Sequence, residues 1–208
     1  MKKVPPDPLK KLSTEWQGLE FEVKPSLLQH RPASRAMPIR SLQAIIRRIM
    51  LNVKIICVGN LKESYLKEAV AEYTKRLSGF CSPEVIELKE YRLPDAPSEA
   101  QIKAGMEDEG KRILAAIPPR AAVVALCVEG KQLSSEQLAE YIESTSATAG
   151  CLCFIIGGSH GLSDSVKSVA ALKLSFSKLT FPHQLMRVIL LEAVYRGFNI
   201  IKGTRYHK

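Results

Sequence analysis

The chain has 208 residues, 46% of them hydrophobic, which is enough for one domain with a real core or for two small ones. Its net charge of +9 is concentrated in residues 1–49, where ten Lys and Arg stand against four Asp and Glu, so charge alone is weak evidence for RNA or DNA binding. No apolar run reaches the ~20 residues of a membrane span, and the start lacks the apolar core of a secretory signal, so we expect a globular, cytoplasmic protein with no membrane partner.

Residues 1–49 differ in composition from the rest of the chain. They contain six prolines and, from Val23 onward, a basic tract without acidic residues. This composition predicts a basic, proline-rich, poorly ordered extension. Three interpretations stay open: a start-site artefact upstream of a natural start at Met50, an organelle-targeting peptide, or an arm that contacts RNA. Three glutamates before Val23 disfavour a targeting peptide, and we favour the start-site artefact.

From Met50 onward, strand patterns alternate with helix patterns. Short apolar runs that end at Gly or turn residues indicate buried strands, and apolar residues every three or four positions indicate helices. This alternation predicts a parallel, layered α/β sheet in a single domain, 50–208. The expected strands are Val53–Val58, Val85–Leu88, Ala121–Val128, Cys151–Ile156 and Leu172–Ser177; the expected helices are Glu63–Leu77, Ser98 to about Ala116, Ser134 or Ser135 to Ile142, and Pro182 to near Ile201.

Glycines follow the fourth expected strand directly, in the loop Gly157-Gly158-Ser159-His160-Gly161. Glycines there let a ligand approach the backbone, and ligands of open α/β sheets bind at the carboxyl ends of the strands. The loop matches neither G-x-G-x-x-G nor a P-loop, which disfavours a dinucleotide or a nucleoside triphosphate. A simple tight turn and a ligand site remain equally open from this motif alone.

A second loop, 176–181, follows the fifth expected strand with two aromatics, two hydroxyls and a lysine. It either ends the strand and caps the next helix, with Thr180 as the cap and Pro182 in the first turn, or it walls an adenine-sized pocket beside the glycine loop. The two loops are expected at the tips of neighbouring strands. The last helix is apolar on nearly every side, so we expect a second copy of the chain to cover it.

The five cysteines lie mostly inside apolar runs and are odd in number. Cys151 and Cys153 point to one side of a strand, with no second pair at zinc spacing. They are interpreted as buried free thiols, and no metal site is predicted.

Several long motifs resemble one family in order and spacing. They are Gly157-Gly-Ser-His-Gly161-Leu, then Leu-Ser-Phe-Ser-Lys-Leu-Thr-Phe-Pro182-His183-Gln-Leu-Met-Arg187-Val, then Glu192-Ala-Val-Tyr195-Arg196, and Tyr206-His207-Lys208 at the end. Together they resemble the ribosomal RNA large-subunit methyltransferase H family of the SPOUT superfamily. The resemblance covers residues 50–208 and leaves 1–49 without a counterpart.

The resemblance implies a SPOUT (α/β-knot) fold with a C-terminal trefoil knot and a homodimer. General rules alone would have rejected a knot, because threaded chains are rare. It implies an enzyme that uses S-adenosylmethionine to methylate N3 of a pseudouridine in large-subunit ribosomal RNA on assembled ribosomes. Alternatives are a SPOUT methyltransferase for a ribose 2′-hydroxyl or a tRNA base, and a non-catalytic RNA-binding or ribosome-assembly factor.

The same resemblance supplies the expected site residues. The sulfonium methyl needs no metal, so catalysis depends on positioning, and a base or a cation would help remove the N3 proton. The residues expected to bind the cofactor are Leu126, Gly157, Phe176, Ser177, Lys178, Leu179, Thr180 and Phe181. The candidates for the proton step, among which the sequence does not choose, are His183, Arg187, Arg205, Tyr206 and His207, the last three on a tail that could reach across a dimer.

Overall fold

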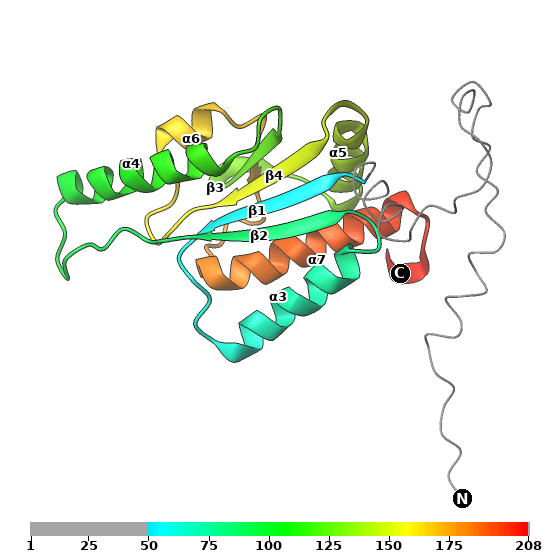
Figure 1. Cartoon of the computed structure of the whole chain (residues 1–208), viewed down its shortest axis with the longest axis horizontal. Coiled ribbons are helices and arrows are strands. Elements are labelled where there is room, and N and C mark those ends of the chain that lie inside the picture. Colours follow the sequence, from blue (N-terminus) through cyan, green and yellow to red (C-terminus); the bar gives the residue numbers. More distant parts are fainter. Residues whose placement is uncertain (1–49, 208) are drawn as a thin grey trace, which may run out of the picture. The chain divides into compact units, whose positions relative to one another are not determined.

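A computed structural model describes residues 50–207 of the protein, His207 through its backbone only. The predictions made for residues 1–49 lie outside this range. Figure 1 shows the elements, whose bounds follow. The strands are β1 (Asn52–Val58), β2 (Ser82–Leu88), β3 (Ala122–Gln132), β4 (Cys151–Ile156) and β5 (Leu172–Ser175); the helices are α3 (Ser64–Leu77), α4 (Glu99–Ala116), α5 (Ser135–Thr148), α6 (Asp164–Ser168) and α7 (His183–Ile201), with a final 3₁₀ turn, η2 (Arg205–His207).

The strands form one five-stranded sheet in the order β2-β1-β4-β3-β5, and every pair in it is parallel. The predicted parallel α/β sheet is therefore confirmed. One expectation was wrong: β4 and β5, which carry the two loops, are not neighbours, because β3 lies between them. The loops still meet, since parallel strands all end at the same edge of the sheet.

Helices cover both faces of the sheet (Figure 1), which explains why the strands read as continuous apolar runs. On one face, Val53, Ile55 and Cys57 of β1 pack with residues of α3, α5 and α7. On the other face, Ile56 and Val58 pack with residues of α4 and α6. The side chains of β1 thus alternate between two apolar layers, as a central strand requires.

Helix α7 lies against the sheet with α3 and α5 beside it. Leu190, Leu191 and Val194 are fully buried in this layer. Burial of one such side chain stabilises the fold by about 1.5–3 kcal/mol. Leu185, by contrast, is 40% exposed. The single chain therefore buries one side of α7 and leaves part of its apolar surface open.

Helix caps could be read from local sequence with mixed success. The caps predicted at Ser98 and at Ser134 or Ser135 are confirmed at Ser98 and Ser134, each of which accepts a hydrogen bond from the backbone N–H three residues on; each also completes a capping box, which was not predicted. The expected cap at Thr180 was wrong. Pro182 precedes the first helical residue of α7, and no side chain caps that helix. Helix α6 and the turn η2 were not predicted, because each is too short to show a period.

Within residues 50–207, no helix is long and apolar enough to cross a membrane.

Candidate functional site

A pocket of about 380 Å³ opens where the carboxyl ends of β3, β4 and β5 meet the start of α7. This size lies within the range of small-molecule sites. We call it the first pocket. Seven of the eight residues expected to bind a cofactor line it, and they are Leu126, Gly157, Phe176, Ser177, Leu179, Thr180 and Phe181. The eighth, Lys178, is an exposed residue of the same loop and is not part of the wall.

A bulge in β3 forms one wall of the first pocket. Leu174 of β5 pairs with Leu126 before the bulge and again with Lys131 after it, so residues 127–130 loop out of the ladder. Three of these residues, Cys127, Val128 and Glu129, line the pocket. The sequence showed only an apolar run at this point, and the bulge was not foreseen.

The glycine loop is both a tight turn and a wall of the pocket. A Cβ atom on Gly157 would lie 2.4 Å from the carbonyl oxygen of Gly161, a contact that the backbone cannot accept. Gly158 and Gly161 form an antiparallel bridge, and Gly161 has a φ of 87°, which favours glycine. The two interpretations left open by the sequence are therefore compatible.

Apolar side chains surround the mouth of the first pocket. Leu179 is 72% exposed, Val128 is 56% exposed and Phe181 is 37% exposed. The second loop is held by its own hydroxyls: Ser175 donates to the carbonyl oxygen of Ser177, and the Ser177 hydroxyl accepts from the N–H of Leu179, both at 3.0 Å. This rim offers apolar surface to whatever occupies the pocket.

His183, the first residue of α7, also lines the first pocket. Burial lowers the pKa of its imidazole below the usual value of 6.5, a nearby Glu90 opposes that shift, and the charges of Arg187 and Lys62 add to it. A neutral imidazole can accept a proton. His183 is thus the one predicted candidate for the proton step that the described chain places in the pocket wall.

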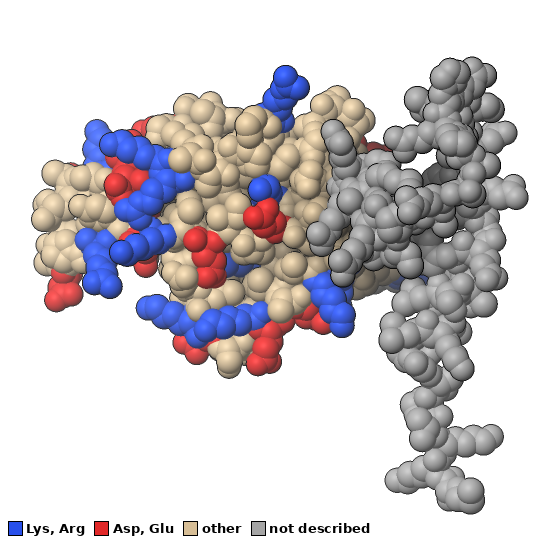
Figure 2. Space-filling model, in the orientation of Figure 1, with Lys and Arg blue, Asp and Glu red and all other residues tan. Residues whose placement is uncertain are grey.

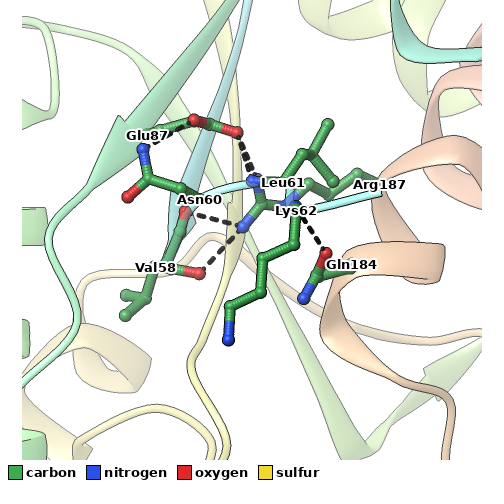
Figure 3. A network of polar contacts seen from close by, with 8 residues as sticks. Val58, Asn60, Leu61, Lys62, Glu87, Gln184 and Arg187 are labelled. Carbon is green, nitrogen blue, oxygen red and sulfur yellow. Dashed lines mark hydrogen bonds and ion pairs between the residues drawn. The ribbon is translucent and has the colours of Figure 1, made fainter. Parts of the chain in front are cut away.

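Arg187, one turn further along α7, is fully buried (Figure 3). Its Nη2 donates to the carbonyl oxygens of Val58 and Gly59, at 2.9 and 2.8 Å, and its Nη1 donates to the carboxylate of Glu87 at 2.6 Å. It does not line the pocket. The structure places this candidate behind the site, where it positions the chain segment that follows β1.

The segment after β1 is fixed from two sides (Figure 3). Glu87 accepts hydrogen bonds from the backbone N–H of Leu61 at 3.1 Å and from the side chain of Asn60 at 3.0 Å. Gln184 of α7 accepts from the backbone N–H of Lys62 at 3.1 Å. The network ties the end of β1 to the first turn of α7 and so fixes the surroundings of His183.

The tail lies at the opposite end of α7 from His183. Nineteen helical residues at 1.5 Å each separate the two ends by about 28 Å. The ring of Tyr206 packs edge-on against Tyr195, 4.9 Å between centroids, and its hydroxyl donates to Glu192 at 3.3 Å. Within one chain, Arg205, Tyr206 and the backbone of His207 are therefore not brought to the pocket.

The described residues contain no group of three or more His, Cys, Asp or Glu side chains suited to hold a metal. All five cysteines are free thiols, and four of them are buried. Burial raises the pKa of Cys57, Cys81 and Cys153 to about 12. These thiols are core residues.

Comparison with known proteins fits this arrangement. A family model described as "Predicted SPOUT methyltransferase" matches residues 51–207. The chain belongs to the SPOUT methyltransferase family. The family resemblance seen in the sequence is thereby confirmed, and a SPOUT methyltransferase is an enzyme.

Curated relatives of this SPOUT methyltransferase share one name, "Ribosomal RNA large subunit methyltransferase H". The protein from Bacillus pumilus is 52% identical over 160 residues, and that from Leuconostoc mesenteroides is 50% identical over 159, each match covering 76% of this chain and all of the relative. A crystal structure titled as a probable methyltransferase from Bordetella pertussis is 12% identical, with a TM-score of 0.50 over 74% of this chain and 99% of that one. That similarity supports the fold alone.

Proposed function

We propose that the first pocket binds S-adenosylmethionine. Apolar side chains of Leu126 and Phe176 can exclude water from the adenosine, and the backbone of the two loops can hydrogen-bond its polar edges. Gly157 lines the pocket and has no side chain, so its backbone can come close to a ligand. The sulfonium of this cofactor supplies an electrophilic methyl group.

The acceptor we propose is N3 of a pseudouridine in large-subunit ribosomal RNA within the assembled ribosome. The name shared by the curated relatives supports the class of RNA. The described core is only mildly cationic, which suits an enzyme that docks on a preformed ribosomal surface better than one that grips free RNA by charge.

In the proposed reaction, an N3–CH₃ bond forms as the S–CH₃ bond breaks, and the N3 proton passes to a base. His183 is the base we propose, and its position in the pocket wall and the lowering of its pKa by burial support this role. Arg187 and Gln184 hold the segment beside it, so they act through positioning.

The proposal includes a homodimer and a C-terminal knot. Leu185, Val188 and Ile189 leave an apolar stripe on α7 that the single chain does not bury completely. A two-fold pairing of α7 with its copy in antiparallel orientation would bring the tail of one protomer, with Arg205 and Tyr206, to the His183 end of the other. The tail candidates then act in the partner's site.

The observation that supports the proposal most strongly is that the glycine loop and the loop 176–181, which carry the family motifs, line one and the same pocket. The test is calorimetry with S-adenosylmethionine, followed by transfer of a labelled methyl group to intact ribosomes, with free ribosomal RNA as the comparison. We expect binding, labelling of ribosomes and modification at a pseudouridine N3. Absence of cofactor binding would favour a non-catalytic RNA-binding or assembly factor. Label on a ribose or a tRNA base would instead favour a different SPOUT specificity.

A further inference from the structure

A second pocket, of about 710 Å³, adjoins the first and shares its wall residues Ser159, His160 and His183. It is bounded by the segment after β1, the loop after β2 and one side of α4. The family motifs contribute Ser159, His160, His183 and Gln184 to it, and the residues from the loop after β2 and from α4 lie outside those motifs. Any molecule in this second pocket faces the first pocket across that shared wall.

The second pocket is lined by a largely buried glutamate whose carboxylate has one oxygen open to the pocket. Glu109 of α4 is only 9% exposed, and its Oε1 accepts from the backbone N–H of Tyr91 at 2.8 Å. Among residues 50–207, its Oε2 has no hydrogen-bond partner, although the side chain lines the pocket. Burial raises the pKa of Glu109, and the Tyr91 hydrogen bond opposes that rise. Oε2 is not among the fully buried atoms without a partner in the described chain, so solvent in the pocket reaches it, and a donor on a bound ligand can replace that water.

Cations outnumber anions at the rim of the second pocket. Lys62, Lys89 and Arg92 line it and are exposed, together with one exposed carboxylate, Glu90. Figure 2 shows Lys and Arg side chains gathered over α4 and the loop that precedes it, at the left of the view. Cations at the mouth and a 38% exposed tyrosine, Tyr91, beside them match the phosphates and the flat base of a nucleotide.

We propose that the second pocket receives the acceptor nucleotide of the RNA, with Oε2 of Glu109 accepting an N–H of its base and Lys89 and Arg92 holding the flanking phosphates. The inference rests on the proposed function and adds where the acceptor lies. Ser159 and His183 line both pockets. A base in the second pocket and a methyl donor in the first can therefore approach each other beside these two residues.

Glu90 joins the two pockets physically. Its carboxylate accepts from the hydroxyl of Ser159 at 3.1 Å, and so ties the glycine loop to the loop after β2. A Cβ on Gly59 would lie 3.7 Å from Nε2 of His183 and 3.8 Å from Oε2 of Glu90, so both groups face the same small space.

The first test is Glu109→Gln in the full-length protein, with Glu107→Gln on the same helix as the control, because Glu107 lines neither pocket. Glutamine keeps an acceptor for Tyr91 and replaces Oε2 by an NH₂ group. We expect KM for ribosomes to rise about tenfold, the cost of one lost hydrogen bond, and the affinity for S-adenosylmethionine to stay within about twofold. Equal kinetics for the two variants would overturn the proposal.

The second test compares two double variants that remove the same charge. Lys89→Ala with Arg92→Ala should raise KM for ribosomes on the order of tenfold. The slope of log KM against log salt concentration should fall by the amount expected for the loss of about two phosphate contacts. Lys103→Ala with Lys111→Ala, exposed cations of α4 outside both pockets, should change neither.

Two results would overturn the inference: identical behaviour of the two double variants, or a loss of cofactor affinity in the pocket variants, which would make the second pocket part of the cofactor site. Failure of the wild-type protein to bind S-adenosylmethionine or to label ribosomes would instead contradict the proposed function itself.

Discussion

The guanidinium of Arg187, at the start of the last helix, donates to the carboxylate of Glu87, 100 positions earlier at the end of β2, with 2.6 Å between Nη1 and Oε1. The Arg187 side chain is 0% exposed, and that of Glu87 is 31% exposed. The pair is therefore asymmetric: water can reach the anion but not the cation. The buried Nε of Arg187 has no hydrogen-bond partner among the described residues, so the cation depends heavily on its remaining partners.

Glu87→Gln is expected to lower the free energy of unfolding by on the order of 3 kcal/mol, because it leaves a buried cation without its counter-charge. Urea denaturation measures this. Glu84→Gln on the same strand is the matched control, since its ion pair with Lys54 is half exposed at 55% on the glutamate side, and it should cost less than about 1 kcal/mol. Similar decreases in the free energy of unfolding for both variants would show that the buried pair contributes no more to stability than the exposed one.

Gly157→Ala is expected to weaken S-adenosylmethionine binding by about tenfold or more. Its Cβ would collide with the backbone of Gly161, which cannot move aside as a flexible side chain could. Gly150→Ala is the control, because a Cβ there meets nothing within 4 Å. Calorimetry would compare the two affinities. An unchanged affinity in Gly157→Ala would remove the glycine loop from the cofactor site.

Local signals accounted for most of the elements. Serines before the expected helices predicted the cap at Ser98 and the cap at Ser134 or Ser135, and the apolar run Cys151–Ile156 predicted a buried strand. The two loops expected to bind the cofactor were located through family motifs, and seven of the eight residues expected to bind it line one pocket. The physics of the loops alone had left a simple turn equally open.

What could not be read from the sequence depends on contacts between distant segments. The place of β3 between β4 and β5 is set by packing of the whole sheet, and the bulge after Leu126 exists only relative to β5. Likewise, nothing near Arg187 in the sequence reveals that Glu87 will neutralise it. For this reason Arg187, a charged residue on an apolar helix, was predicted as a catalytic candidate.

His183→Asn is expected to lower the rate of methyl transfer by about 10²- to 10⁴-fold, the usual contribution of a general base. Protonation of the imidazole would block its role, so the wild-type rate should fall as the pH falls through the His183 pKa. Because burial lowers that pKa, the fall should begin below the ordinary value of 6.5. Rate profiles of both proteins at saturating cofactor measure this. An acid limb that persists unchanged in His183→Asn would assign the proton step to another group.

Glu109→Gln is expected to change how stability depends on pH. A carboxyl group whose pKa is raised in the folded protein stabilises the fold below its unfolded value, 4.5, and this contribution is lost as the pH rises through the folded pKa. Glutamine does not titrate. The difference in Tm between wild type and variant should therefore shift in favour of the variant as the pH rises from about 4.5 to neutrality. A difference that stays constant with pH would show that burial of Glu109 does not perturb its ionisation.

Cys127 provides a direct probe of the first pocket. It is the one cysteine in the described part of the chain that is not buried, and it lines the pocket from the β3 bulge. We expect iodoacetamide to label Cys127 first in the folded protein. Because burial raises the pKa of its thiol, the labelling should be slower than that of a free thiol at neutral pH.

If the first pocket is the cofactor site, S-adenosylmethionine at ten times its Kd should slow the labelling of Cys127 by about tenfold, since only the unoccupied fraction reacts. Peptide mapping by mass spectrometry measures the rate at each cysteine, and Cys127→Ser identifies the signal. A labelling rate that the cofactor leaves unchanged, in a protein that binds the cofactor by calorimetry, would place the methyl donor elsewhere on the molecule. If the cofactor protects Cys127 and the Cys127→Ser variant still binds it normally, Cys127 lies at the cofactor site and its thiol is not required for binding.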